Sequence, residues 1–235
     1  MSGEWGVVIV AAGRGTRMGT AESKQYLKLQ DKPILVHTLE IFQGMDEVGE
    51  IALVVGEADQ ERCGRWVEEY GLTKVIAIAA GGRERQHSVV RGLAALSAGW
   101  VMVHDAVRPL VTRDAVRNVC QEAQRTGAAV LAVPVKDTIK QVSEAGLIVA
   151  TPDRRSLWAI QTPQAFRREL LERAHEEAEE SGFLGTDDAM VVERMGASVT
   201  VALGDYTNIK ITTPEDLPWA EYLLGELRSR GSAET

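Results

Sequence analysis

The chain has 235 residues, of which 45% are hydrophobic, and a formal net charge of −8, which fits one soluble α/β domain spanning residues 1–235. The acidic balance excludes non-specific nucleic-acid binding, because such binding needs a basic face against the backbone phosphates. No apolar run approaches the ~20 residues that cross a bilayer, and the N-terminus lacks the pattern of a signal peptide, so we expect a cytoplasmic protein with no membrane contact.

Short apolar runs rich in β-branched residues predict strands that are buried on both faces. The segments between these runs repeat apolar residues with helical spacing. Strands and helices in alternation predict an α/β fold with a Rossmann-like, mostly parallel twisted sheet covered by helices on both sides. The predicted strands are residues 6–12, 51–55, 75–79, 100–104 and 128–133.

Two helices have recognisable ends. Thr112 is a candidate N-cap before a periodic stretch that Gly127 closes. Thr213 is a candidate N-cap for the last helix, with Pro214 at its first helical position. We therefore expect helices to start and end at these residues.

A different pattern occupies residues 137–152, where polar and apolar residues alternate around Glu144-Ala145-Gly146. This alternation predicts a β-hairpin that projects from the α/β core. Because an isolated hairpin is only marginally stable, we expect it to pack on something, and a second subunit is the simplest partner.

The cysteines and histidines do not indicate a metal site. Cys63 and Cys120 lie in separate helix-like segments without a C-x-x-C pattern, so we expect two free thiols. None of the four histidines has metal-ligand spacing. His104, at the end of a predicted strand, is expected to pack rather than to catalyse.

A glycine-rich loop follows the first strand. Residues 11–19 read AAGRGTRMG, and residues 23–27 read SKQYL. Gly13 and Gly15 allow a backbone conformation in which successive N–H groups point into a concavity suited to phosphate oxygens. In open α/β sheets ligands bind at this place, outside the carboxyl ends of the strands. The loop therefore predicts binding of a nucleotide triphosphate.

Other interpretations of the loop explain it less well. A dinucleotide fingerprint needs a glycine where Met18 stands and an acidic residue after the second strand, so an NAD-dependent oxidoreductase is a weaker alternative. A Walker A loop is excluded because no G-x-x-x-x-G-K-[ST] occurs. A purely structural turn gives no reason for Arg14, Arg17 and Lys24 to accompany the glycines.

With AAGRGTRMG and SKQYL the chain resembles the 2-C-methyl-D-erythritol 4-phosphate cytidylyltransferases of the non-mevalonate isoprenoid pathway. The resemblance covers about residues 5–225 and implies a nucleotidyltransferase-type sheet with a β-arm, residues 136–156, that serves dimerisation. The further blocks, in the family's order, are residues 81–85 with Ser88, 103–109, 134–138, 157–158 through 162–164, 186–188 and 208–210.

The resemblance implies a specific reaction. A phosphate oxygen of 2-C-methyl-D-erythritol 4-phosphate attacks the α-phosphorus of CTP, giving 4-CDP-2-C-methyl-D-erythritol and pyrophosphate. A phosphate monoester is already largely anionic near neutral pH, so catalysis can rest on positioning and charge stabilisation without a protein nucleophile. The nearest alternative is a ribitol-5-phosphate cytidylyltransferase, since a related family shares the glycine loop.

Site residues are carried over from the family block by block. The expected catalytic residues are Arg17, Lys24, Arg154 and Lys210. The presence of all four argues against a binding module without catalytic activity. The expected CTP-binding residues are Ala11, Ala12, Gly13, Gly15, Thr16, Gly82, Arg85, Ser88, Asp105 and Ala106. The expected acceptor-binding residues are Asp105, Arg108, Thr138, Thr162 and Thr186.

Two further expectations concern a partner chain and a metal. In the family the arm reaches the neighbouring subunit, which implies a homodimer in which Arg154 acts in trans. Mg²⁺ is expected to be held mainly by the phosphates of CTP, because a hard cation neutralises their charge and keeps several waters. Asp105 is the nearest candidate ligand, and direct and water-mediated contact both remain open.

Overall fold

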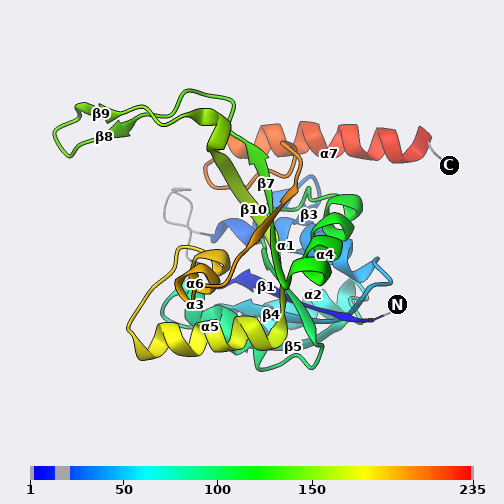
Figure 1. The fold of residues 1–235 in the computed structure, drawn as a ribbon. Coiled ribbons are helices and arrows are strands. Elements are labelled where there is room, and N and C mark those ends of the chain that lie inside the picture. The colour runs from blue at the N-terminus through cyan, green and yellow to red at the C-terminus, as the bar shows by residue number, and fades with distance from the viewer. Residues whose placement is uncertain (1–2, 14–21, 234–235) are drawn as a thin grey trace.

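The computed structural model describes residues 3–13 and 22–233, and its centre is a seven-stranded sheet of order β11-β7-β10-β6-β1-β4-β5 (Figure 1). The pairs β1–β4, β1–β6, β4–β5 and β7–β11 are parallel, and β10 is antiparallel to β6 and β7. The strands are β1 (Trp5–Ala11), β4 (Val48–Val55), β5 (Val75–Ala80), β6 (Trp100–Asp105), β7 (Ala128–Pro134), β10 (Trp158–Arg167) and β11 (Thr200–Leu203). The predicted α/β fold with a mostly parallel sheet is confirmed.

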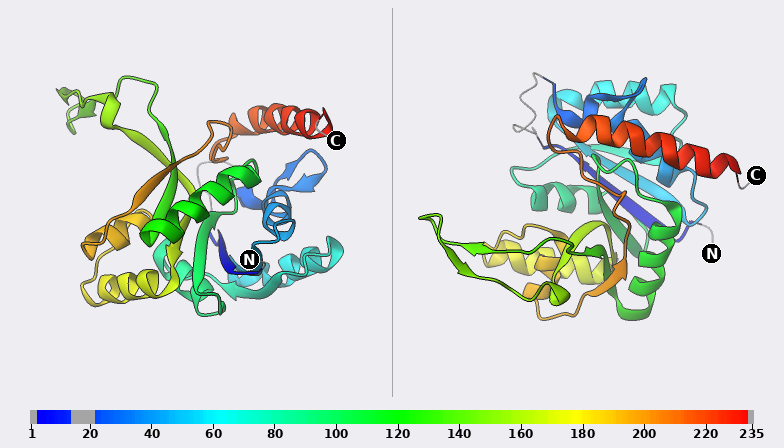
Figure 2. Two further views of the ribbon diagram at one scale, coloured as in Figure 1. Left: turned by 45° about the vertical axis from the view of Figure 1, so that its right-hand side comes forward. Right: turned by 90° about the horizontal axis from the view of Figure 1, so that it is seen from above.

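Helices cover both faces of this sheet (Figure 2). Val7 and Ile9 of β1 pack in one core cluster with α1, α2 and α4, whereas Val8 packs in another with α3, α5 and α6. The continuous apolar run of β1 is thus explained by burial on both sides. Cys63 and Cys120 are buried in the first cluster as free thiols, as predicted. These helices are α1 (Ile34–Gln43), α2 (Gln60–Glu69), α3 (Arg85–Leu93), α4 (Arg113–Thr126), α5 (Arg168–Glu180) and α6 (Asp188–Arg194).

The helix ends agree with the sequence for α4 and differ for α7 (Asp216–Ala233). The Thr112 hydroxyl accepts the N–H of Ala115 at 3.2 Å, and Gly127 closes α4 with a φ of 95°. Helix α7 starts later than predicted from Pro214, because the Asp216 carboxylate accepts two preceding backbone N–H groups at 2.7 and 2.8 Å. None of the helices within residues 3–13 and 22–233 is long and apolar enough to cross a membrane.

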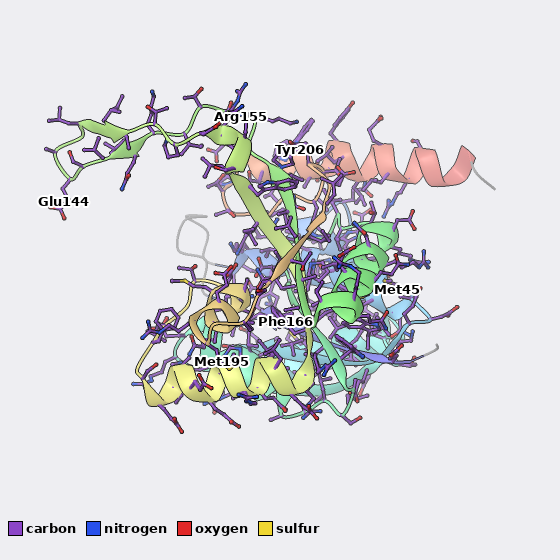
Figure 3. The ribbon with its side chains drawn as sticks, in the orientation of Figure 1. Met45, Glu144, Arg155, Phe166, Met195 and Tyr206 are labelled. Atoms are coloured by element: carbon purple, nitrogen blue, oxygen red, sulfur yellow. The ribbon has the colours of Figure 1, made fainter. Side chains whose placement is uncertain are left out.

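The predicted hairpin is present and projects from the body of the molecule as an arm (Figures 1 and 3). It is formed by β8 (Gln141–Val142) and β9 (Ile148–Ala150), with Glu144 at its tip. Its turn closes with Gly146 at a φ of 78°, a conformation that favours glycine. Apolar side chains of the arm are exposed within this single chain, with Leu147 at 68% and Ile148 at 63%.

Strands β10 and β11 were not predicted. The sequence of β10 interrupts its apolar residues with Gln161, Thr162, Pro163 and Gln164, so it lacks a continuous apolar run. Its pairing with β7 shifts register between Ile160 and Gln164. The polar side chains are nevertheless buried, and they contribute to a cavity at the edge of the sheet described below.

A small hairpin links the glycine-rich loop to the first helix. It consists of β2 (Lys28–Leu29) and β3 (Lys32–Pro33), and it packs against α7 through an apolar cluster that includes Leu29, Leu223 and Leu224. The C-terminal helix therefore covers the segment that follows the loop.

Candidate active site

A cavity of 310 Å³ lies where β1 and β6 end and α3 begins. All of the predicted CTP-binding residues that the structure describes line it: Ala11, Ala12, Gly13, Gly82, Arg85, Ser88, Asp105 and Ala106. Lys24 and Lys210 line it as well. Gly15, Thr16 and Arg17 lie outside the described residues. We call this space the first cavity.

The end of β1 is held by a side chain to which the sequence had given no role. Gln25, in the short 3₁₀ helix Lys24–Tyr26, is 3% exposed and donates from Nε2 to the carbonyls of Ala11 at 2.6 Å and Gly13 at 3.2 Å. These bonds occupy the carbonyls of Ala11 and Gly13, so the backbone of this segment is fixed where it lines the cavity. The SKQYL motif contained this residue, but only the fold brings it back to β1.

The segment between β5 and α3 is fixed in a similar way. The Ser88 hydroxyl accepts the N–H of Gly82 at 3.0 Å and donates to the Glu84 carbonyl at 3.2 Å. Arg91 donates to the Gly81 carbonyl at 2.8 Å. Ser88 thus shapes the backbone that forms the wall of the first cavity.

Gly81 packs so closely against the glycine-rich loop that a methyl group there would lie 2.2 Å from the Cβ of Ala12. The resemblance implies that this loop binds CTP, so Gly81→Ala, which would displace Ala12, is expected to raise the KM for CTP, as steady-state pyrophosphate release would measure. Gly99→Ala is the matched control, because a Cβ at Gly99 meets nothing within 4 Å. An unchanged KM in Gly81→Ala would contradict contact between this loop and CTP.

A second cavity, of 160 Å³, adjoins the first. It contains four of the five predicted acceptor-binding residues, namely Asp105, Arg108, Thr162 and Thr186. Arg85, Asp105 and Lys210 line both cavities and so form a shared wall. The remaining lining residues are Ile160, Gln161, Gln164 and Asp187.

Asp105 is the centre of the shared wall. Its carboxylate lies 2.9 Å from Lys210 Nζ, 3.4 Å from Arg108 Nε and 3.8 Å from Arg85 Nε. Burial alone would raise the pKa of Asp105, but Lys210, Arg85 and Arg108 together hold that pKa well below its usual range. The carboxylate is therefore ionised, and the cations around it outnumber it, which suits a site for phosphate groups.

His104 and Thr162 fix each other beside this carboxylate. His104 is fully buried, burial lowers its pKa to about 4, and its ring is therefore neutral at pH 7. Its Nε2 lies 3.1 Å from the Arg108 carbonyl, which can only accept, so Nε2 carries the proton and Nδ1 accepts from the Thr162 hydroxyl at 3.0 Å. The same hydroxyl accepts the N–H of Asp105 at 3.0 Å. Thr162 can thus offer a ligand only a lone pair.

Two predicted residues lie apart from both cavities. Arg154, in the 3₁₀ helix Arg154–Ser156, donates to the Lys136 carbonyl at 2.8 Å at the base of the arm. Thr138 belongs to the same exposed region. Within one chain the structure does not bring these two residues to the cavities that hold Lys24 and Lys210.

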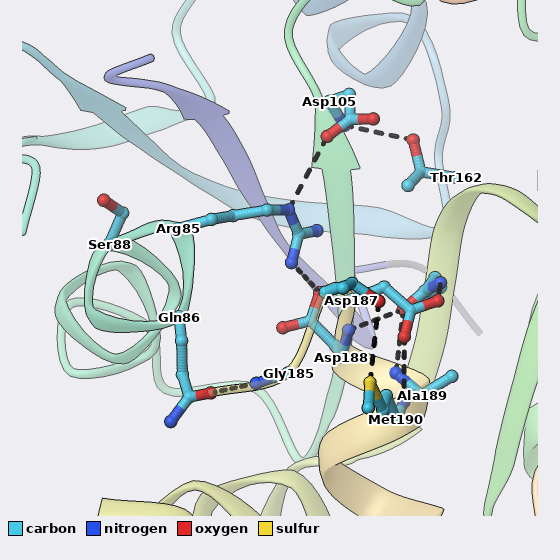
Figure 4. A network of polar contacts seen from close by, with 12 residues as sticks. Arg85, Gln86, Ser88, Asp105, Thr162, Gly185, Asp187, Asp188, Ala189 and Met190 are labelled. Carbon is cyan, nitrogen blue, oxygen red and sulfur yellow. Dashed lines mark hydrogen bonds and ion pairs between the residues drawn. The ribbon is translucent and has the colours of Figure 1, made fainter. Parts of the chain in front are cut away.

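Two residues that contact the site or its neighbouring segments, Asp188 and Gln86, were not predicted from the sequence. Figure 4 shows Arg85 between Asp105 and Asp188, and Gln86 bound to Gly185. Asp188 belongs to the block of residues 186–188, of which the resemblance had given a role to Thr186 alone. Within the described part of the chain, no group of three or more His, Cys, Asp or Glu side chains is arranged to hold a metal ion.

The fold and the site are those of a nucleotidyltransferase, because residues 11–13, which begin the glycine-rich segment, and two adjoining cavities lined by cations meet at the strand ends of a mostly parallel sheet. The chain belongs to the 2-C-methyl-D-erythritol 4-phosphate cytidylyltransferase family, whose model matches residues 6–226. It is accordingly an enzyme that uses CTP, and membership of this family favours methylerythritol phosphate as the acceptor over the ribitol phosphate and dinucleotide alternatives.

Individual relatives agree with this membership. The chain is 47% identical over 231 residues to the 2-C-methyl-D-erythritol 4-phosphate cytidylyltransferase of Alkaliphilus metalliredigens, covering 97% of this chain and 96% of that one. It is 49% identical over 219 residues to that of Geobacillus thermodenitrificans, covering 92% and 95%. Its fold matches the crystal structure of the Thermus thermophilus enzyme of the same name with a TM-score of 0.79, at 34% identity and 95% and 98% coverage.

Proposed function

We propose that the first cavity binds CTP and the second binds 2-C-methyl-D-erythritol 4-phosphate, so that the chain makes 4-CDP-2-C-methyl-D-erythritol and pyrophosphate. The observation that carries this proposal is the wall of Arg85, Asp105 and Lys210 that the two cavities share. Phosphate groups bound in the two cavities would both lie against these three side chains, and this would bring a phosphate oxygen of the acceptor toward the α-phosphorus of CTP. In such an arrangement the catalytic gain comes from holding the two reactants in line.

The cations are proposed to stabilise the charge of the transferring and departing phosphates. Lys24 and Arg17 would act at the α-phosphate and pyrophosphate, and Lys210 at the point where the acceptor phosphate meets CTP. Support comes from the position of Lys24 in the first cavity and of Lys210 in both. No covalent protein intermediate is required, since the acceptor phosphate is itself the nucleophile.

Mg²⁺ is proposed to bind mainly through the phosphates of CTP. When bound, it neutralises phosphate charge and keeps several waters, so few protein ligands are needed. Asp105 is the one carboxylate that lines both cavities among the described residues, and Lys210, Arg108 and Arg85 already surround it. This crowding favours contact between Asp105 and the metal through water over direct coordination.

The active form is proposed to be a homodimer of two single nucleotidyltransferase domains, residues 1–235, joined through the arm of residues 136–156. The exposed apolar side chains of the arm, including Val142, Leu147, Ile148 and Val149, support burial against a second copy. Arg154 at the base of the arm, with Thr138 nearby, would then reach the acceptor cavity of the partner.

The reaction is tested by pyrophosphate release from CTP with methylerythritol phosphate, with ribitol 5-phosphate and with no acceptor. Of these three mixtures, only the one with CTP and methylerythritol phosphate is expected to release pyrophosphate. This release should stop when EDTA is added and should return with excess Mg²⁺. Turnover with ribitol 5-phosphate in place of methylerythritol phosphate would overturn the acceptor assignment. Full activity in EDTA would overturn the metal requirement.

A further inference from the structure

We infer that Asp188 is a positioning residue for the transfer, which acts through Arg85 to hold Asp105 at the wall between the two cavities. The Arg85 guanidinium lies between two carboxylates, with Nη1 at 2.7 Å from Asp188 Oδ2 and Nε at 3.8 Å from Asp105 Oδ1 (Figure 4). A planar guanidinium can present separate N–H groups to two carboxylates at once, which an ammonium cannot do from one point. This inference rests on the proposed function of the shared wall.

Asp188 is a fixed anchor. It is 1% exposed, and its other oxygen lies 3.4 Å from Nε2 of the buried His175. Burial would raise the pKa of Asp188, but the charge of Arg85 and the contact with His175 keep it below its usual range, so the carboxylate is ionised. Because a buried charge without its partner is strongly unfavourable, the pairing restricts the guanidinium to one place.

The backbone of Asp188 is itself fixed by a residue of the second cavity. Gln164 of β10 accepts the N–H groups of Asp188 and Ala189, each at 3.0 Å, and donates to the Asp187 carboxylate at 2.8 Å. Gln164 is 1% exposed and lines the second cavity. The anchor thus has a defined position relative to the proposed acceptor site.

The residue after Arg85 makes a second link to the same segment. Gln86 accepts the N–H of Gly185 at 3.0 Å and donates to the Phe183 carbonyl at 3.1 Å. Arg85 and Gln86 therefore bind helix α3, which begins at the first cavity, to residues 183–188, which carry Thr186 into the second. The two substrate cavities share a cross-linked support as well as a wall.

The chemistry of the reaction gives this support a purpose. A guanidinium that is free to turn would move toward the nearest phosphate and leave Asp105 held by Lys210 and Arg108 alone. The carboxylate and Lys210 would then shift relative to the α-phosphorus, and a displacement of about 1 Å at a reacting centre can cost on the order of 100-fold in rate. Asp188 prevents this movement without touching either substrate.

The test is a double-mutant cycle on kcat with Asp188→Asn and Arg85→Gln. Asp188→Asn removes the negative charge at nearly constant volume and is expected to lower kcat by roughly 10- to 100-fold. The KM for CTP should change much less than kcat, because the backbone of residues 11–13 and Gly82, which also lines the first cavity, is held by Gln25 and Ser88. In the double variant the second substitution should add little, since Asp188 has no effect once Arg85 is gone.

Glu40→Gln is the matched control, because Glu40 pairs with Lys32 at 2.6 Å and lines neither cavity. Should Asp188→Asn fail to fold by circular dichroism, Arg85→Lys replaces it, and its kcat should fall almost as far as that of Arg85→Gln. Additive losses in the cycle, or a normal kcat in Arg85→Lys, would overturn the inference.

Asp105→Asn separates this inference from the proposed function on which it rests. If Asp105→Asn keeps the parent kcat, the proposed role of the shared wall is wrong. If Asp105→Asn lowers kcat and Asp188→Asn does not, only the role of Asp188 is wrong.

Discussion

Replacing Lys210 by methionine is expected to lower kcat on the order of 100- to 1,000-fold, the usual cost of removing one charge-stabilising donor from an active site. Lys210 Nζ lies 2.9 Å from Asp105 Oδ2, and the side chain lines both cavities. A methionine side chain is about as long as the apolar stem of lysine, so the substitution keeps that stem and removes the ammonium group. The measurement is steady-state pyrophosphate release with both substrates saturating.

The same substitution should also change the pH dependence. Of the cations around Asp105, Lys210 lowers the pKa of that carboxyl the most, whereas burial raises it. Removing the Lys210 charge should therefore raise the pKa of Asp105. Because the ionised carboxylate is the active form, the acidic limb of the residual rate should move to higher pH. Lys32→Met is the control, since it removes the cation of an ion pair at 2.6 Å that lines neither cavity. A kcat within threefold of the parent, about 0.7 kcal/mol of transition-state stabilisation, would contradict the role of Lys210.

The parts of the fold that follow from local pattern could be predicted. Five apolar runs marked five strands of the sheet because parallel strands buried on both faces are continuously apolar. Strand β10 could not be predicted this way. Its middle carries Gln161, Thr162 and Gln164, whose polar groups are satisfied by Asn208, Asp205, His104 and the N-terminus of α6. Those partners are distant in the sequence, so only the folded chain explains why a strand is formed there.

The same distinction applies to the site. The place of Asp105 at the end of a strand could be predicted, because the carboxyl end of a strand is a local feature, whereas its proposed role came from the resemblance. Of the glycine-rich loop, the structure describes residues 11–13, and these line the first cavity. Arg85 was assigned to CTP, yet its closest charged contact is Asp188, 103 positions further along the sequence and 2.7 Å away in space. No local pattern relates these two residues. The contact depends on how α3 and α6 pack on the same face of the sheet.

The proposed action of Arg154 across a dimer leads to the second large effect. Arg154→Ala and Lys24→Ala are each expected to lose activity on the order of 100- to 1,000-fold as homodimers, because each removes one cation from every site. The two chains, carrying different affinity tags, can be coexpressed and the heterodimer isolated by sequential purification. Pyrophosphate release by that heterodimer is then compared with release by the parent homodimer.

If Arg154 acts in trans, the heterodimer contains one site with its own Lys24 and an intact Arg154 from the partner, and one site that lacks both. It should therefore regain about half of the parent rate. If Arg154 acts within its own chain, each site lacks one cation and the heterodimer stays inactive. Arg155→Ala is the matched control: its side chain is 88% exposed and pairs with Asp153 at 2.6 Å, so its homodimer should keep the parent rate. Equal losses in Arg154→Ala and Arg155→Ala would instead mean that the whole segment at the base of the arm had been disturbed, and that a specific contact of Arg154 with the partner's acceptor cavity is wrong.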